Sequence, residues 1–126
     1  MAKKTTKQLY AEFSEETQQY MATVHKYLTA KFSTINAEWY GALYMLAQNY
    51  DMFIMCGRDI KEKGLMIPNR FGTLDKNPLI KTQIDAQIQC VKLLQEFGLT
   101  PKAAARMTQT DNNAEMEEFV KDLVNG

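Results

Sequence analysis

Apolar positions recur at helical spacing in three long segments of the chain, and the last of these has the clearest boundaries. Residues 77–107 read NPLIKTQIDAQIQCVKLLQEFGLTPKAAARM. Asn77 is a good N-cap, Pro78 suits the first helical position, and Gly98 can adopt the left-handed conformation of a Schellman motif. Thr100, with a proline after it, repeats the pattern of a helix start. A long helix followed by a short one is therefore predicted.

The long helix between these caps carries two apolar stripes. One stripe contains Ile80, Ile84, Ile88, Val91 and Leu94, and the other contains Leu79, Ala86, Cys90, Leu93 and Phe97. A helix that is apolar over much of its circumference is either enclosed by a large core or shared with another chain. Because 126 residues provide few helices to enclose it, association is expected through Leu79, Ile84, Ile88, Val91, Leu93 and Phe97. The alternative is a central helix with neighbours on two sides within one monomer.

Two further helical segments precede this one. Residues 9–32 form either one long helix or two shorter helices divided at Ser14, which can cap a new helix. The next helix begins at Asn36 and ends at Gly64, and Asp51 on it is expected to face water. Its buried stripe is expected to contain Trp39, Leu43, Leu46, Ala47, Tyr50, Ile54 and Gly57, while three methionines broaden its apolar surface, namely Met45, Met52 and Met55.

The remaining segments complete an all-α prediction with two long central helices and an N-terminal helix. Residues 65–76 break the periodicity and are expected to form a loop or a weak hairpin. Three parts are expected: a basic arm running into helix at 1–13, a helical oligomerisation core at 14–107, and a linker with a partner-binding helix at 108–126. This last, short acidic helix suits a groove on a partner, and docking on its own domain is the alternative. Its apolar positions are Met116, Phe119, Val120 and Leu123.

Charge limits how the protein can bind nucleic acid. Fifteen basic residues balance fifteen acidic ones, so no global field attracts the chain to a polyanion, and binding must come from local clusters. The candidate DNA contacts are Lys3, Lys4 and Lys7 in the arm, Arg58, Lys61, Lys63, Arg70 and Lys76 around the loop, and Lys102 and Arg106 near the C-terminal turn.

No catalytic constellation is visible in the sequence. It has no phosphate-binding glycine loop, no metal-ligand spacing, and no histidine beside a candidate nucleophile, so neither a metal nor another cofactor is predicted. His25 is expected at the surface or at an interface. Cys56 and Cys90 lie on different predicted helices and are expected to be buried, reduced thiols, as suits a cytosol. The most apolar window, residues 39–56, contains polar side chains, so no membrane span is expected.

The order of features also resembles a known family. A helix ending in IKEKGLMI, a polar loop, KNPLIK, a helix and EFGLTPKAAARM together resemble the small terminase subunit of tailed bacteriophages over roughly residues 15–107. That family commonly has two basic residues separated by one position after GLTP. This sequence keeps Arg106 but has Ala104 at the first of those positions.

The resemblance implies a DNA-packaging factor that is not an enzyme. Such a protein assembles as a ring in the cytoplasm of the infected bacterial host, engages double-stranded viral DNA, and regulates the large terminase subunit, which the C-terminal helix would bind. Two alternatives stay open from the residues themselves. One is a dimeric helix-turn-helix regulator with its turn at 98–100. The other is a structural helical protein that binds a partner.

Overall fold

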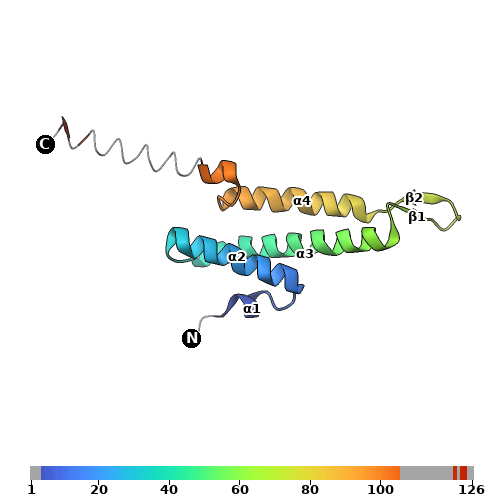
Figure 1. Cartoon of the computed structure of the whole chain (residues 1–126), viewed down its shortest axis with the longest axis horizontal. Helices are drawn as coiled ribbons and strands as arrows, with labels where there is room; N and C mark the ends of the chain where they lie inside the picture. Colours follow the sequence, from blue (N-terminus) through green and yellow to red (C-terminus); the bar gives the residue numbers. More distant parts are fainter. Residues whose placement is uncertain (1–3, 106–120, 122, 125–126) are drawn as a thin grey trace. The chain divides into compact units, whose positions relative to one another are not determined.

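The computed structural model describes residues 4–105, 121 and 123–124, and this described chain is helical apart from one small hairpin (Figure 1). The all-α prediction is confirmed. The elements in order are α1 (Thr6–Leu9), α2 (Glu15–Phe32), the 3-10 turn η1 (Ala37–Trp39), α3 (Tyr40–Lys63), β1 (Met66–Pro68), β2 (Leu74–Lys76) and α4 (Leu79–Glu96). The chain forms two compact units, Met1–Leu93 and Leu94–Gly126.

The N-terminal segment consists of two helices because two local caps divide it. The Thr5 hydroxyl accepts from the Gln8 amide at 3.2 Å while the Gln8 side chain accepts from the Thr5 amide at 2.9 Å, which is a capping box at the start of α1. Ser14 has extended backbone angles and its hydroxyl accepts from the Thr17 amide, so α2 begins after it. The two-helix alternative is therefore correct.

Asp51 joins α3 to the start of α2. Its Oδ1 atom accepts from the Ser14 amide at 3.0 Å, the Ser14 hydroxyl at 2.7 Å and the Thr17 hydroxyl at 2.8 Å. Burial alone would raise the pKa of Asp51, but the hydrogen bonds from Ser14 and Thr17 outweigh it and lower that pKa. The expectation that Asp51 faces water is wrong, because α2 begins directly over this carboxylate.

His25 is also buried, contrary to the expectation of a surface or interface position. The Tyr10 hydroxyl lies 2.6 Å from His25 Nε2, and both residues are almost fully covered. Burial lowers the pKa of His25 and raises the pKa of Tyr10 to about 12, so both groups are neutral at pH 7. A buried polar group needs a hydrogen-bonding partner, and here the end of α1 supplies it from fifteen residues earlier.

Helices α3 and α4 approach each other closely at a glycine. A Cβ atom added at Gly57 would lie 2.9 Å from the Gln83 side-chain nitrogen, which donates to the Phe53 carbonyl at 3.5 Å. Ala86 and Cys90 on the same side of α4 are buried. Burial raises the pKa of the Cys90 thiol to about 11, so it is a protonated core residue, as expected. The part of the second apolar stripe that carries Ala86 and Cys90 therefore packs within the first unit.

The core between α2 and α3 is built from their facing apolar side chains. Tyr20 and Tyr50 stack with ring centroids 4.1 Å apart and planes 13° from parallel. The fully buried members are Met21 and Leu28 from α2 and Leu43, Leu46 and Ala47 from α3. Among described residues that are not exposed, no buried side-chain nitrogen or oxygen lacks a hydrogen-bond partner.

A weak antiparallel hairpin connects α3 to α4, so the hairpin alternative for residues 65–76 is correct. Strand β1 pairs with β2 in the register Met66 with Lys76. Asn77 then binds three backbone groups: its Nδ2 donates to the Gly64 carbonyl at 3.1 Å, its amide donates to the Leu65 carbonyl at 2.8 Å, and its Oδ1 accepts from the Leu79 amide at 3.0 Å. The predicted cap is confirmed and also holds the end of α3.

The second unit contains the other predicted turn. Gly98 has φ 69°, the Leu99 amide donates to the Leu94 carbonyl at 2.8 Å, and the Gly98 amide donates to the Gln95 carbonyl at 3.1 Å, which is a Schellman motif. The Thr100 hydroxyl accepts from the Ala103 amide at 3.2 Å, and residues 101–105 are helical. The predicted linker at 108–113 lies outside the described residues.

Replacing Asp51 with asparagine should destabilise the fold. The neutral amide weakens three hydrogen bonds that now end on a carboxylate, which is expected to cost about 1 to 2 kcal/mol and to lower the melting temperature by roughly 3 to 8 °C. Thermal melts followed by circular dichroism measure this. The control is Asp59→Asn, which removes a helical ion pair between the half-buried Asp59 and the exposed Lys63 and should lower stability by less than about 0.5 kcal/mol. Equal losses in both variants would contradict the role of Asp51.

Stability should also fall between about pH 6.5 and pH 5. Burial lowers the pKa of His25, so below its usual value the unfolded chain binds a proton more readily than the folded chain does, and the stability present above the unfolded pKa is lost as pH falls. His25 is the single histidine, and carboxylates titrate below this window. Urea midpoints at pH 7.5 and pH 5 should differ in the wild type and converge in His25→Gln. A variant with an unchanged difference would exclude His25 as the cause.

Candidate functional site

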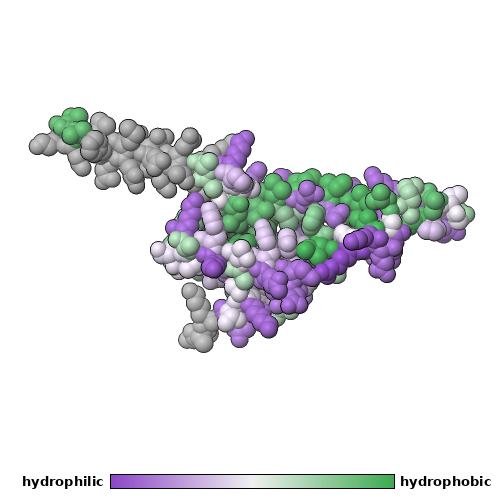
Figure 2. All heavy atoms as spheres, in the orientation of Figure 1, coloured by the Kyte–Doolittle hydropathy of each residue, from purple (hydrophilic) through white to green (hydrophobic). Residues whose placement is uncertain are grey.

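The first apolar stripe of α4 is largely uncovered. Ile84, Ile88 and Val91 are 48%, 46% and 41% exposed, and Ile80 on the same side is half-buried. These four residues are called the isoleucine face. Figure 2 shows apolar atoms extending along α4 on the side that faces the viewer. A contiguous apolar patch on a small unit is typical of a surface that binds another macromolecule.

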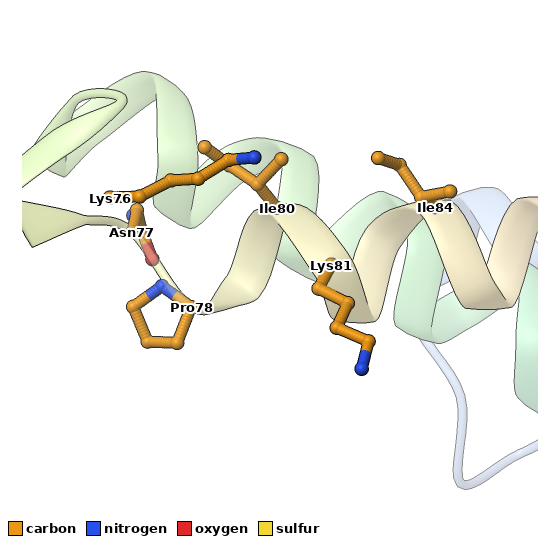
Figure 3. Close-up of a pocket in the computed structure, with 6 residues that line it drawn as sticks. All are labelled: Lys76, Asn77, Pro78, Ile80, Lys81 and Ile84. Atoms are coloured by element: carbon orange, nitrogen blue, oxygen red, sulfur yellow. The ribbon is translucent and has the colours of Figure 1, made fainter.

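Two open hollows follow one another along the isoleucine face. The first has a volume of about 370 Å³ and the second about 400 Å³, and both include Ile84. Figure 3 shows Ile80 and Ile84 pointing to one side of α4 while Lys81 points to another. Lysines form the rims, namely Lys76, Lys81 and Lys92. With an apolar floor, this strip suits the side chains of another protein better than a polar small molecule.

The residues expected to mediate association divide into two groups. Ile84, Ile88 and Val91 are exposed and available to another chain. The other three are half-buried, namely Leu79, Leu93 and Phe97. Within the first unit, α4 contacts α3 through Gln83, so the side of α4 that carries Ala86 and Cys90 is covered and the side that carries Ile84 and Ile88 is open.

A second apolar surface lies on α3 and was not singled out as a site in the sequence. Met45, Met52 and Met55 are 56%, 44% and 55% exposed. These three residues are called the methionine face. The signal that would have identified it is spacing, because Met45 and Met52 are seven residues apart and lie off the stripe that contains Leu43 and Ala47.

The basic residues around the loop collect at the hairpin end of the first unit, but two of them are already paired. Arg58 forms an ion pair with Glu16, and Lys63 Nζ lies 3.1 Å from Asp59 Oδ1. The Arg70 guanidinium lies 4.9 Å from the ring centre of Phe71, an aromatic side chain that is 77% exposed. The exposed cations that remain in this part of the structure are Lys61, Arg70, Lys76 and Lys81, and they are called the hairpin-end cluster.

Two other predicted cationic residues lie apart from this cluster within the first unit. Lys4 and Lys7 are exposed at the start of α1, and Figure 1 shows α1 and the hairpin on different parts of the first unit. Lys102 is exposed in the second unit. Lys3 and Arg106 lie outside the described residues. Within the described part of the first unit, the basic residues therefore form two separate groups.

The predicted site for the large subunit falls mostly beyond what the structure describes. Leu123 is helical and 69% exposed, and Val124 beside it is 78% exposed. Met116, Phe119 and Val120 lie outside the described residues. The exposure of Leu123 is compatible with a role in binding a partner.

Two further observations concern other classes of site. Within residues 4–105 and the few described near the C-terminus, no group of three or more histidine, cysteine, aspartate or glutamate side chains is placed to hold a metal ion. No helix in the described part of the chain has the length and apolar character needed to cross a bilayer.

Comparison with known proteins places these observations in a family. A family model described as "Phage terminase, small subunit" matches residues 23–114, which is most of the 126-residue chain. No curated protein and no solved structure matches this chain. The matched region contains α3, the hairpin, α4 and the Schellman turn, together with the C-terminal half of α2. The chain therefore belongs to the small-subunit family of phage terminases, which has its role in packaging phage DNA.

Proposed function

We propose that this protein assembles into a ring through α4, engages double-stranded viral DNA, and presents it to the large terminase subunit in the cytoplasm of the infected bacterial host. It contributes binding and assembly, and the large subunit supplies the catalysis. The observation that carries this proposal is the isoleucine face, whose β-branched side chains remain about half exposed on a well-formed helix of a packaging protein.

The free energy gained by burying the isoleucine face indicates what kind of surface it must contact. A fully buried isoleucine or valine contributes about 1.5 to 3 kcal/mol, so covering the exposed half contributes about 1 kcal/mol per side chain. Three such residues supply about 3 kcal/mol, which is less than the roughly 4 kcal/mol or more that association costs in translational and rotational freedom. The neighbouring surface must therefore be apolar as well.

DNA binding is expected to come from weak contacts that are repeated in every subunit of the ring. A neutral subunit with one or two phosphate contacts binds duplex weakly, because non-specific affinity comes from counterions released by several contacts together. A ring repeats each basic group many times along one duplex, so weak contacts add through high effective concentration. Between the candidate groups we favour the arm, Lys3, Lys4 and Lys7, because Arg58 and Lys63 near the hairpin are already paired with carboxylates.

The helix-turn-helix alternative receives less support. A recognition helix starting at residue 101 presents Lys102 and then three alanines at 103–105. Alanine offers only a methyl group to base edges, so few sequence-specific contacts are available in this part of the helix. The proposal for the C-terminal helix remains that its apolar residues, including Leu123, bind the large subunit.

Charging the isoleucine face should dissociate the assembly. In Ile88→Asp, a carboxylate would have to be buried against an apolar neighbour, so the mass in light scattering should fall from that of an oligomer to the 14.5 kDa subunit. Gln89→Asp is the matched control, because Gln89 is also exposed on α4 and points away from the face. A wild-type protein that already runs as a compact monomer at micromolar concentration would rule out assembly.

Neutralising the arm should weaken the salt dependence of DNA binding. Changing Lys3, Lys4 and Lys7 together to glutamine reduces counterion release, so the slope of log affinity against log salt should fall by about 0.9 for each phosphate that is no longer neutralised. Fluorescence anisotropy with a duplex at several salt concentrations measures the slope. The comparison variant carries Lys61, Arg70 and Lys76 as glutamine. If only this comparison variant flattens the slope, the arm does not bind the phosphates.

A further inference from the structure

We infer that neighbouring subunits join head to tail, with the isoleucine face of one copy packed on the methionine face of the next. This inference rests on the assembly proposed above and names the surface that receives α4. It follows from where the two faces lie on the first unit, from their shapes, and from the charges beside them.

The surface of α3 can be divided into three sides, and α2 and α4 cover two of them. Asp51 and Arg58 face α2, since they bond to Ser14 and Glu16. Gly57 faces α4, since it contacts Gln83. At about 100° per residue, Met52 lies roughly 100° from Asp51 and roughly 140° from Gly57. Met45 and Met52 therefore lie on the third side, and Met55, which lies about 40° from Asp51 but one turn further along α3, is also 55% exposed.

The two apolar faces point to opposite sides of the α3–α4 pair. Gly57 and Gln83 mark the point at which these antiparallel helices face each other. In an antiparallel pair, positions displaced in the same direction along the sequence from such a point turn to the same side. Met52 lies five residues before Gly57, whereas Ile88 lies five residues after Gln83. The displacements are equal and opposite, so one subunit presents an apolar surface in each direction.

The shapes of the two faces are complementary. The isoleucine face has hollows of about 370 and 400 Å³ between stiff β-branched side chains. Methionine is unbranched and flexible, so it can enter irregular hollows of this kind. Along the helix axis, Met45 to Met55 spans about 15 Å and Ile80 to Val91 about 16 Å at 1.5 Å per residue. The two surfaces therefore match in length as well.

The net charges beside the two faces have opposite sign, with Asp85 counted beside Lys81 and Lys92 on α4 and Lys63 counted beside Asp59 and Glu62 on α3. Lys81 and Lys92 line the hollows of the isoleucine face. On α3, Asp59 and Glu62 follow Met52 and Met55 by seven residues and so continue the same rows, although Asp59 also binds Lys63 at 3.1 Å. Opposite charges at the rim favour this pairing, whereas contact between two isoleucine faces would bring lysines together. A head-to-tail contact is also the kind that closes into a ring.

Two variants of the full-length chain test the arrangement. Ile88→Asp spoils the α4 surface and Met52→Asp spoils the α3 surface, so each variant alone should fail to assemble and run at 14.5 kDa in light scattering. When they are mixed, the intact isoleucine face of the Met52 variant meets the intact methionine face of the Ile88 variant. The mixture should form one-to-one pairs of twice the subunit mass and grow no further.

Controls separate misfolding from disruption of the interface. Circular dichroism should show unchanged helix content in both variants, and Gln89→Asp should keep the wild-type mass. A Met52→Asp protein that keeps the wild-type mass, or that forms pairs by itself, overturns the head-to-tail contact and leaves assembly through α4 standing. Two variants that stay monomeric when mixed also overturn it. A monomeric wild type overturns both the inference and the proposed assembly.

Discussion

The close approach of α3 and α4 at Gly57 decides which apolar side chains the subunit hides. Because glycine has no Cβ, the Gln83 side chain can lie against the α3 backbone, and this fixes which side of each helix faces inward. Ala86 and Cys90 become core residues as a result, and Ile84 and Ile88 on the next side of α4 stay outside. The surfaces offered to other molecules are thus determined by the contact that builds the core.

The size of the unit explains why these surfaces exist. Three helices around one core can cover only part of each helix, and small domains bury a smaller fraction of their surface than large ones do. Helix α3 has 24 residues and reaches past the part that α2 covers. Apolar residues on the uncovered sides, such as Met52 and Ile88, either stay exposed to water, which is energetically unfavourable, or are covered by another chain. The proposed role in a packaging assembly favours the second outcome.

Local rules of the sequence account for most of the fold. Ser14, Asn77 and Gly98 are capping residues whose effect depends on a few neighbouring amides, so each helix boundary they predict is confirmed. The errors concern Asp51 and His25, whose environment depends on residues 15 to 37 positions away. The sequence shows that these two side chains are polar. It does not show that the tertiary fold places the hydroxyl groups of Tyr10, Ser14 and Thr17 beside them.

The sequence predicted only part of the candidate site, because the exposure of each residue also depends on the tertiary fold. Periodicity identified both stripes of α4, but only the position of α3 could show that the stripe with Ile84 and Ile88 is the open one. The sequence shows the spacing of the methionine face, but it does not show which sides of α3 the rest of the unit covers. Pairing of Arg58 with Glu16 likewise depends on the packing of α2 against α3, so the sequence overstated the free charge near the hairpin.

Asn77 gives the subunit a mechanical property. Its side chain and amide hold the end of α3 through Gly64 and Leu65, and its side chain also holds the first turn of α4 through Leu79. The hairpin leaves and re-enters the fold between these bonds, which anchor its base to both helices. In the proposed assembly, a force on the hairpin would pass into α4 and reach the isoleucine face, so it would act on the contact between subunits.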